Sequence, residues 1–235
     1  MPFAETRSWR TSVLYGRTVI TLSARLASLL SPTRVDQAAE VVRRYFASRS
    51  EGGFTGAYFE RLGGGGDRPE TADVFTAEDL VAVSMLSVRV EGGAAIELLL
   101  RRSDRLTELL RAIPAHVRLG ELTVDDLGDT WAPRALYREL RTIESIGPTT
   151  ASKLLARKRP HLVPVYDTVV DRELSLIKGD LWKPLHAWLI ADRGANERHL
   201  TQVRDRAGVP DISVLRIFDV LAWMTGSGNV EVDHE

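Results

Sequence analysis

The chain has no cysteine among its 235 residues. Disulfide bonds, thiolate nucleophiles, cysteine zinc sites and iron–sulfur clusters are therefore excluded, and we expect no disulfide-linked partner. The histidines are scattered rather than set at the spacing of metal ligands, at His116, His161, His186, His199 and His234. We therefore expect no metal ion and no cofactor.

Long apolar runs are also missing, and none approaches the roughly 18 residues that a membrane-spanning helix needs. The N-terminus lacks the pattern of a signal peptide. Hydrophobic residues make up 44% of the chain and charged residues 27%, the balance of an ordinary soluble globular protein. We expect a cytoplasmic protein without membrane contact, large enough for one domain or two smaller lobes.

The chain has no excess of charge, with a formal net charge of −1 at pH 7. Proteins that hold nucleic acid through phosphate contacts usually carry a basic excess, so any such surface here must be local. The best basic candidate consists of Lys153, Arg157, Lys158 and Arg159. A solvated helix end explains these residues equally well, because cations are favoured near helix C-termini.

Apolar residues recur at helical spacing through most of the chain, as Leu136, Leu140 and Ile143 do, and predict an all-α fold. Four consecutive glycines at 63–66 have neither a strand before them nor Gly-Lys-Ser/Thr after them, which favours a mobile connector over a phosphate loop. The main predicted helices span residues 34–48, 76–90, 94–101, 103–113, 133–143, 149–158, 168–177, 181–191, 196–207 and 213–225.

Residues 143–151 read Ile-Glu-Ser-Ile-Gly-Pro-Thr-Thr-Ala and join two of these helices. We expect Gly147 to take the positive φ that reverses the chain, and Pro148 to start the next helix. The first amides of that helix point outward, and its partial positive charge can hold a phosphate without a basic side chain. Such a hairpin would reconcile DNA binding with a nearly neutral chain.

The hairpin and a second motif, Pro164-Val-Tyr-Asp-Thr168, together resemble the helix-hairpin-helix region of the DNA glycosylase superfamily. In that family an aspartate follows the hairpin lysine position by 18 residues, as Asp167 follows Thr149 here. The resemblance implies double-stranded DNA as partner and two helical lobes with the hairpin at the cleft between them. The terminal lobe would comprise residues 1–70 and 168–235, and the other lobe 71–167, with the hairpin at about 133–158.

The resemblance makes Asp167 the candidate catalytic residue. Two departures from the family pattern carry chemical meaning. Thr149 stands where bifunctional members carry a Schiff-base lysine, so covalent lyase chemistry has no amine there. Ser145 replaces the first hairpin glycine and crowds a backbone that must approach DNA. Lys153, one turn on, could supply an amine, although a surface or phosphate-contacting lysine is the simpler interpretation. The candidate DNA-binding residues are Ser145, Ile146, Gly147, Thr149, Thr150 and Lys153.

Glycosidic cleavage passes through an oxocarbenium-like state, which a carboxylate near C1′ can stabilise, or it can activate water. Asp167 is equally suited to cap a helix that starts at Thr168, and both roles can coexist. We expect a DNA-binding protein that resembles a monofunctional base-excision glycosylase. The alternatives are a catalytically silent helix-hairpin-helix module and a helical protein-interaction module without DNA. Trp223, within an apolar stripe, is assigned to the core.

Overall fold

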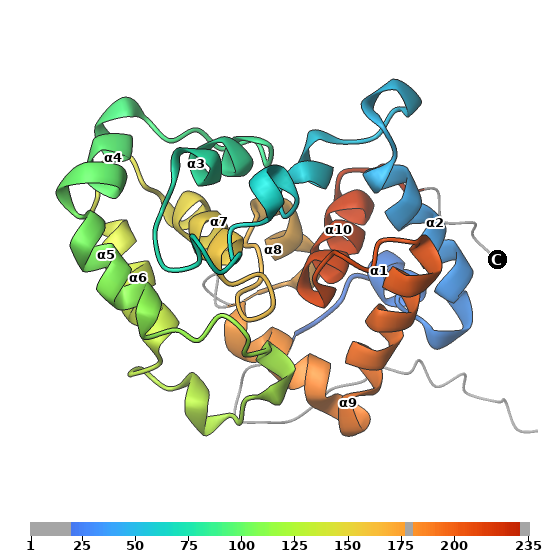
Figure 1. The fold of residues 1–235 in the computed structure, drawn as a ribbon. Coiled ribbons are helices and arrows are strands. Elements are labelled where there is room, and N and C mark those ends of the chain that lie inside the picture. The colour runs from blue at the N-terminus through green and yellow to red at the C-terminus, as the bar shows by residue number, and fades with distance from the viewer. Residues whose placement is uncertain (1–19, 177–180, 231–235) are drawn as a thin grey trace, which may run out of the picture.

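The computed structural model describes residues 20–176 and 181–230. The regular elements in this part of the chain are all helices, so the expected all-α class is confirmed (Figure 1). None of these helices is long and apolar enough to cross a membrane. The α-helices are α1 (Ala24–Leu29), α2 (Val35–Phe46), α3 (Ala77–Ser84), α4 (Gly92–Ile96), α5 (Ser103–Arg111), α6 (Ala132–Arg141), α7 (Pro148–Lys158), α8 (Thr168–Leu174), α9 (Trp182–Ala207) and α10 (Val214–Gly226).

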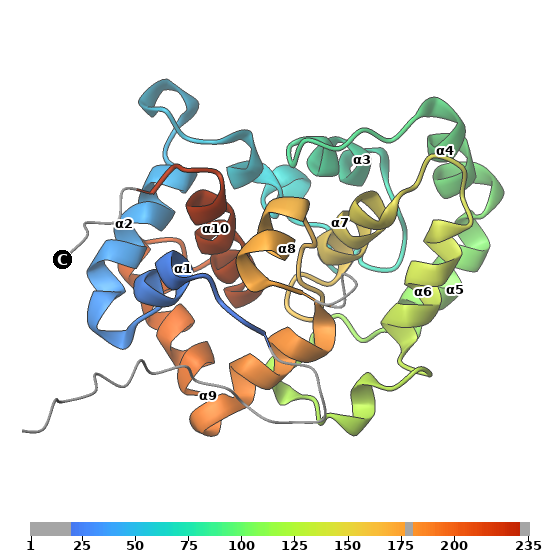
Figure 2. The same ribbon diagram turned by 180° about the vertical axis from the view of Figure 1, so that it is seen from behind.

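The buried apolar side chains form two clusters. The first joins α1, α2, α8, α9 and α10, and the second joins α3, α4, α5, α6 and α7. Figures 1 and 2 show the two groups of helices on opposite sides, with α7 and α8 meeting between them. The lobe boundaries at residues 70 and 167 stay a prediction, because Leu119 belongs to the first cluster and Phe59 to the second.

Helix α10 lies against α1, α2, α8 and α9 and is buried along most of its length. It begins where the Ser213 hydroxyl accepts a hydrogen bond from the Arg216 backbone N–H at 3.1 Å, the usual role of a serine N-cap. The predicted apolar stripe is confirmed, since Leu215, Phe218 and Leu221 are all buried. This helix forms part of the central packing of the first cluster.

Helix boundaries follow local backbone geometry more than apolar spacing. Helix α3 ends at Ser84 rather than near residue 90, and Ser87 takes a left-handed φ of 61° shortly after it. Helix α4 ends at Ile96 and passes into a π-helical turn, Glu97–Arg101. Residues 191–194 leave helical geometry inside α9, which confirms the predicted break between two helical segments.

Candidate functional site

The hairpin joins α6 to α7, but its turn residue differs from the predicted one. Ser145 has the positive φ, 66°, whereas Gly147 is extended with φ −77° and ψ 175°. The expectation for Gly147 was wrong because a residue before proline is pushed away from helical toward extended conformations. Ser145 therefore adopts the conformation that glycine favours, at the position where the resembled family places a glycine.

Gly147 is the N-cap residue of α7, and no side chain caps this helix. The first backbone N–H groups of a helix have no partner within it, and Pro148 has none to offer. A Cβ atom added to Gly147 would meet no atom within 4 Å, so the space above it is open. Of the other predicted contact residues, Ser145 is exposed and Thr149 partly exposed, while Ile146 and Thr150 are buried.

Lys153 is not on the surface, contrary to the simpler interpretation from the sequence. It is only 2% exposed, and its Nζ lies 3.0 Å from Asp167 Oδ2. The same Nζ donates to the backbone carbonyl of Leu86 at 2.8 Å. Lys153 therefore belongs to the surroundings of Asp167, and its ammonium group is directed inward rather than toward an outer phosphate.

Asp167 caps α8, as one of its two predicted roles requires, and its Oδ1 accepts from the Val169 N–H at 2.9 Å. Helix α7 holds the segment before it, because the Ser152 hydroxyl donates to Pro164 O at 3.3 Å and accepts from Tyr166 N–H at 2.9 Å. The second predicted motif is thus fastened to the hairpin helix. The sequence does not reveal this contact, because the Ser152 hydroxyl pairs with backbone groups, which no side-chain pattern marks.

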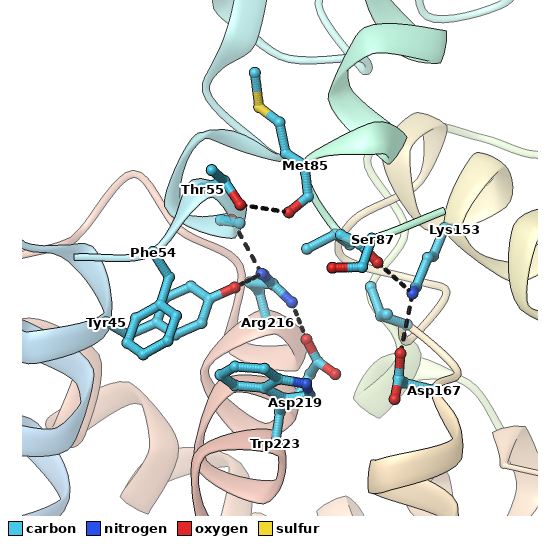
Figure 3. Close-up of a pocket in the computed structure, with 13 residues that line it drawn as sticks. Tyr45, Phe54, Thr55, Met85, Ser87, Lys153, Asp167, Arg216, Asp219 and Trp223 are labelled. Atoms are coloured by element: carbon cyan, nitrogen blue, oxygen red, sulfur yellow. Dashed lines mark hydrogen bonds and ion pairs between the residues drawn. The ribbon is translucent and has the colours of Figure 1, made fainter. Parts of the chain in front are cut away.

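Asp167 and Lys153 line a cavity of about 120 Å³ that also receives side chains of the first hydrophobic cluster (Figure 3). Its wall comes from α2, α7 and α10 and from the segments at residues 54–56, 85–87 and 165–167. Gly56 is required here, because a Cβ on it would overlap the Tyr45 hydroxyl. The lining residues are Tyr45, Phe54, Thr55, Gly56, Met85, Leu86, Ser87, Lys153, Val165, Asp167, Arg216, Asp219 and Trp223.

Arg216 and Asp219 form the charged part of the α10 side of this cavity. The guanidinium donates from Nη1 to Asp219 Oδ2, and from Nη2 to Tyr45 Oη at 2.5 Å and Gly56 O at 3.0 Å. Burial raises the pKa of Asp219, and the positive charges of Arg216 and Lys153 oppose that rise. The cavity thus contains two acids and two bases, with Arg216 and Asp219 nearly enclosed.

Sequence reasoning missed Arg216, Asp219 and Trp223 as site residues and assigned Trp223 to the core. Trp223 packs against the first cluster but is partly exposed, and it lines the cavity. A signal was present, because the three residues lie at i, i+3 and i+7 on an otherwise apolar helix. A charged pair on such a helix faces either solvent or a polar cavity.

The basic residues after Lys153 are buried too, which contradicts both interpretations of them as a surface. Arg157, Lys158 and Arg159 are at most 1% exposed. Arg157 donates to Asp79 at 3.1 Å and to two loop carbonyls. Arg159 donates to carbonyls that include Ala72 O at 2.7 Å. Most of their acceptors are backbone oxygens far away in the sequence, which apolar periodicity does not reveal.

The glycine segment 63–66 lies against the end of α7 rather than forming a free connector. Gly66 is buried, its carbonyl accepts from Lys158 Nζ at 3.1 Å, and a Cβ on it would overlap the Arg157 backbone. The buried cations of α7 therefore organise this loop. Within residues 20–176 and 181–230, no three histidine or acidic side chains converge as metal ligands would. His234 lies outside the described residues.

The described residues thus define a helical protein with a charged cavity between two apolar clusters, and with an exposed turn at Ser145 shortly before α7, the helix that carries Lys153 into the cavity. The chain belongs to DUF6308, a family of unknown function, which it matches over residues 38–226. No curated protein and no solved structure matches the chain. The function must therefore be argued from the site itself.

Proposed function

We propose that this protein binds double-stranded DNA through its helix-hairpin-helix and hydrolyses an N-glycosidic bond of a nucleotide placed in the cavity beside Asp167, without a lyase step. The observation that carries the proposal is the double role of α7. Its first residues form the hairpin, and its Lys153 contacts Asp167 in the cavity. Lys153 lies five positions after Pro148, about 7.5 Å along a helix axis, so a strand bound at the hairpin would pass near the cavity.

The protein would bind a DNA strand through the open backbone at Gly147 and the free amides that the first turn of a helix offers, here that of α7. This mode of binding needs no basic surface, which fits a chain of net charge −1. The target base would have to leave the stack, at a cost on the order of a few kcal/mol. The aromatic and charged lining of the cavity would then replace the stacking and hydrogen bonding that the base gives up.

In the cleavage step, the bond between C1′ and the base nitrogen breaks and positive charge builds up on the sugar. The Asp167 carboxylate would stabilise that charge and accept a proton from the attacking water. The water's hydroxyl ends on C1′, and the departing base keeps the bonding electron pair and takes up a proton. Thr149 offers no amine, and Lys153 as an ammonium in an ion pair is no nucleophile, so no covalent intermediate is proposed.

The proposal is tested with Asp167→Asn, which preserves the shape of the side chain and an oxygen for the α8 cap. The parent protein is incubated with duplexes that carry alkylated, oxidised, deaminated or mismatched bases, and abasic sites are then detected. We expect the parent to release a base, and Asp167→Asn to bind the same duplex but release at least a hundredfold less. Duplex binding by the parent without base release from any substrate would refute the hydrolase.

A catalytically silent DNA-binding module is the second candidate, and one observation favours it. Both carboxylate oxygens of Asp167 are already engaged, Oδ1 by the Val169 N–H and Oδ2 by Lys153. A paired carboxylate stabilises a nearby cation less than a free one. This module predicts duplex binding that weakens as salt rises, without base release. A protein-interaction module without DNA predicts no salt-dependent binding to duplex at all.

A further inference from the structure

We propose that the cavity receives a single six-membered ring that carries an N–H group, a pyrimidine base rather than a purine, and that Asp219 selects it by accepting that N–H. The assignment of this ring to a base of DNA rests on the proposed function. Recognition of the ring by the cavity does not, and free ring compounds can test it without DNA.

The size of the cavity limits its ligand to a single ring. An apolar cavity of about 150 Å³ is known to hold one benzene molecule. The cavity beside Asp167 measures about 120 Å³. The cavity is thus smaller than the one that holds benzene and is open on one side, so it has room for no more than one six-membered ring with its substituents at the mouth, whereas the fused second ring of a purine would have to stay outside or displace the walls.

The aromatic lining of the cavity favours a planar ligand. Tyr45 and Phe54 are stacked with ring centroids 5.2 Å apart, and Trp223 meets Phe54 edge-on at 5.3 Å. Phe54 and Trp223 are only partly buried, so part of their surface is left for a further planar ring. Aromatic surfaces of this kind bind nucleobases by stacking, whatever their sequence. The apolar walls favour a flat ring but do not choose its polar edge.

Asp219 makes that choice. It is only 3% exposed, its Oδ2 is bonded to Arg216, and its Oδ1 accepts no hydrogen bond from the described residues (Figure 3). Oδ1 is not sealed off from solvent, so it faces the cavity and can accept a hydrogen bond from a ring that enters it. Lys153 complements it, because Nζ donates to two acceptors and has a third N–H to offer a ring carbonyl. An edge with N–H beside C=O satisfies both groups.

Two isomers provide the sharpest probe of this edge. 1-Methylthymine keeps the ring N–H, whereas its isomer 1,3-dimethyluracil carries the C5 methyl group on that nitrogen instead. We expect NMR titration of the wild-type protein to give about tenfold or greater preference for 1-methylthymine, because its isomer leaves Asp219 Oδ1 unpaired. The Trp223 indole signal should shift with the bound ring. Equal affinities for the two isomers, or no binding of either at millimolar concentration, would overturn the proposal.

Ring size is tested with 9-methylguanine, a purine whose ring N–H stands beside a carbonyl group, against the pyrimidines 1-methyluracil and 1-methylthymine, which carry the same edge. We expect the pyrimidines to bind tighter, and purine binding of equal strength overturns the size argument. The outcomes are separable from the proposed function. A protein that releases purines from DNA supports the glycosylase and defeats this inference. A protein that binds 1-methylthymine selectively but does not bind duplex DNA supports this inference and defeats the glycosylase.

Asp219→Asn assigns the selection to one residue. The amide should turn its oxygen to Arg216 and present its NH₂ to the cavity, because a donor cannot face the guanidinium. We expect the preference for 1-methylthymine over 1,3-dimethyluracil to disappear, while Asp125→Asn, at an exposed carboxylate, keeps it. An unchanged preference in folded Asp219→Asn excludes Asp219 as the selecting residue. If this variant does not fold, the isomer comparison on the wild-type protein decides alone.

Discussion

Glu60 accepts two hydrogen bonds from Ser213, one from the backbone N–H at 2.8 Å and one from the hydroxyl at 2.7 Å. The same hydroxyl caps α10 by accepting from the Arg216 N–H. A carboxylate about 150 residues away in sequence is thereby tied to the start of the helix that carries Arg216 and Asp219 into the cavity. The charge state of Glu60 consequently bears on the stability of this helix start.

Glu60 should make stability fall with rising pH. Burial raises the pKa of Glu60 from 4.5 to about 7, against the opposing hydrogen bonds from Ser213 and the charge of Arg216. Between these values the folded protein holds a proton that the unfolded chain has lost. Glu60 therefore leaves the free energy of unfolding unchanged below pH 4.5 and lowers it progressively as pH rises to about 7. In denaturant unfolding, the free energy of unfolding of the wild type should fall relative to that of Glu60→Gln over this pH window.

Glu51→Gln is the matched control for the pH experiment. Hydrogen bonds from Ser48 lower the pKa of Glu51, so its contribution is present above its unfolded value and lost only in acid. The difference in unfolding free energy between wild type and Glu51→Gln should be flat above pH 6. A flat difference for Glu60→Gln as well would contradict the assignment of the pH dependence to Glu60.

Asp79→Asn should destabilise the protein by about 3–5 kcal/mol, because it removes the charge partner of two buried cations. Asp79 is 1% exposed and pairs with Arg157 at 3.1 Å and Lys158 at 2.5 Å. Glu78→Gln, one residue earlier, removes an exposed pair with Arg68 and should cost about 1 kcal/mol or less. Denaturant midpoints measure both variants, and equal losses would show that burial of the pair is not what matters.

Gly147→Ala should leave the fold intact but weaken DNA binding. The φ of −77° suits alanine and its Cβ meets no atom of the protein, but alanine is a poorer N-cap than glycine, so stability should change by about 1 kcal/mol or less. The added methyl group would occupy the space through which a phosphate reaches the α7 amides. Gly92→Ala is the matched control, since its Cβ is equally free and it lies at the start of α4. Equal duplex affinity of both variants would argue against the hairpin as the contact.

Ser145→Gly should stabilise the protein by about 1 kcal/mol or less. Ser145 has φ 66°, a conformation costing a side-chain-bearing residue roughly 1–2 kcal/mol, which the greater chain entropy of glycine partly offsets. Ser145→Val should instead lose stability, because a β-branched side chain tolerates this region poorly. Thermal unfolding of the two variants checks the sign. A loss of stability in the glycine variant would mean that the serine side chain makes a stabilising interaction.

Apolar spacing predicted the helices well, because burial of one face is what drives them, as Leu136, Leu140 and Ile143 confirm. The cap at Asp167 was predictable for a similar reason, since it depends on residues next to each other. The turn residue was predicted wrongly although a local rule applies. Proline disfavours helical conformations in the residue before it, and at Gly147 this effect outweighs the freedom of glycine to take a positive φ.

The cavity was not predictable from one sequence. Its wall combines α2, α7 and α10 with three irregular segments, and pairs such as Arg216 and Tyr45 lie 171 positions apart. Most partners of Arg157 and Arg159 are carbonyl oxygens, which every residue has and which no sequence pattern marks. Basic residues at a helix end therefore look the same in sequence whether they meet water or a loop.

The burial of Arg157, Lys158 and Arg159 also changes how the formal charge should be understood. Lys153 and Arg216 are enclosed as well, whereas Asp79 and Asp219 are the only enclosed acids among residues 20–176 and 181–230. The cations that remain free to touch a polyanion are thus fewer than the overall count suggests. A DNA complex of this protein would displace few counterions, so the logarithm of its affinity should decline only gently with the logarithm of salt concentration.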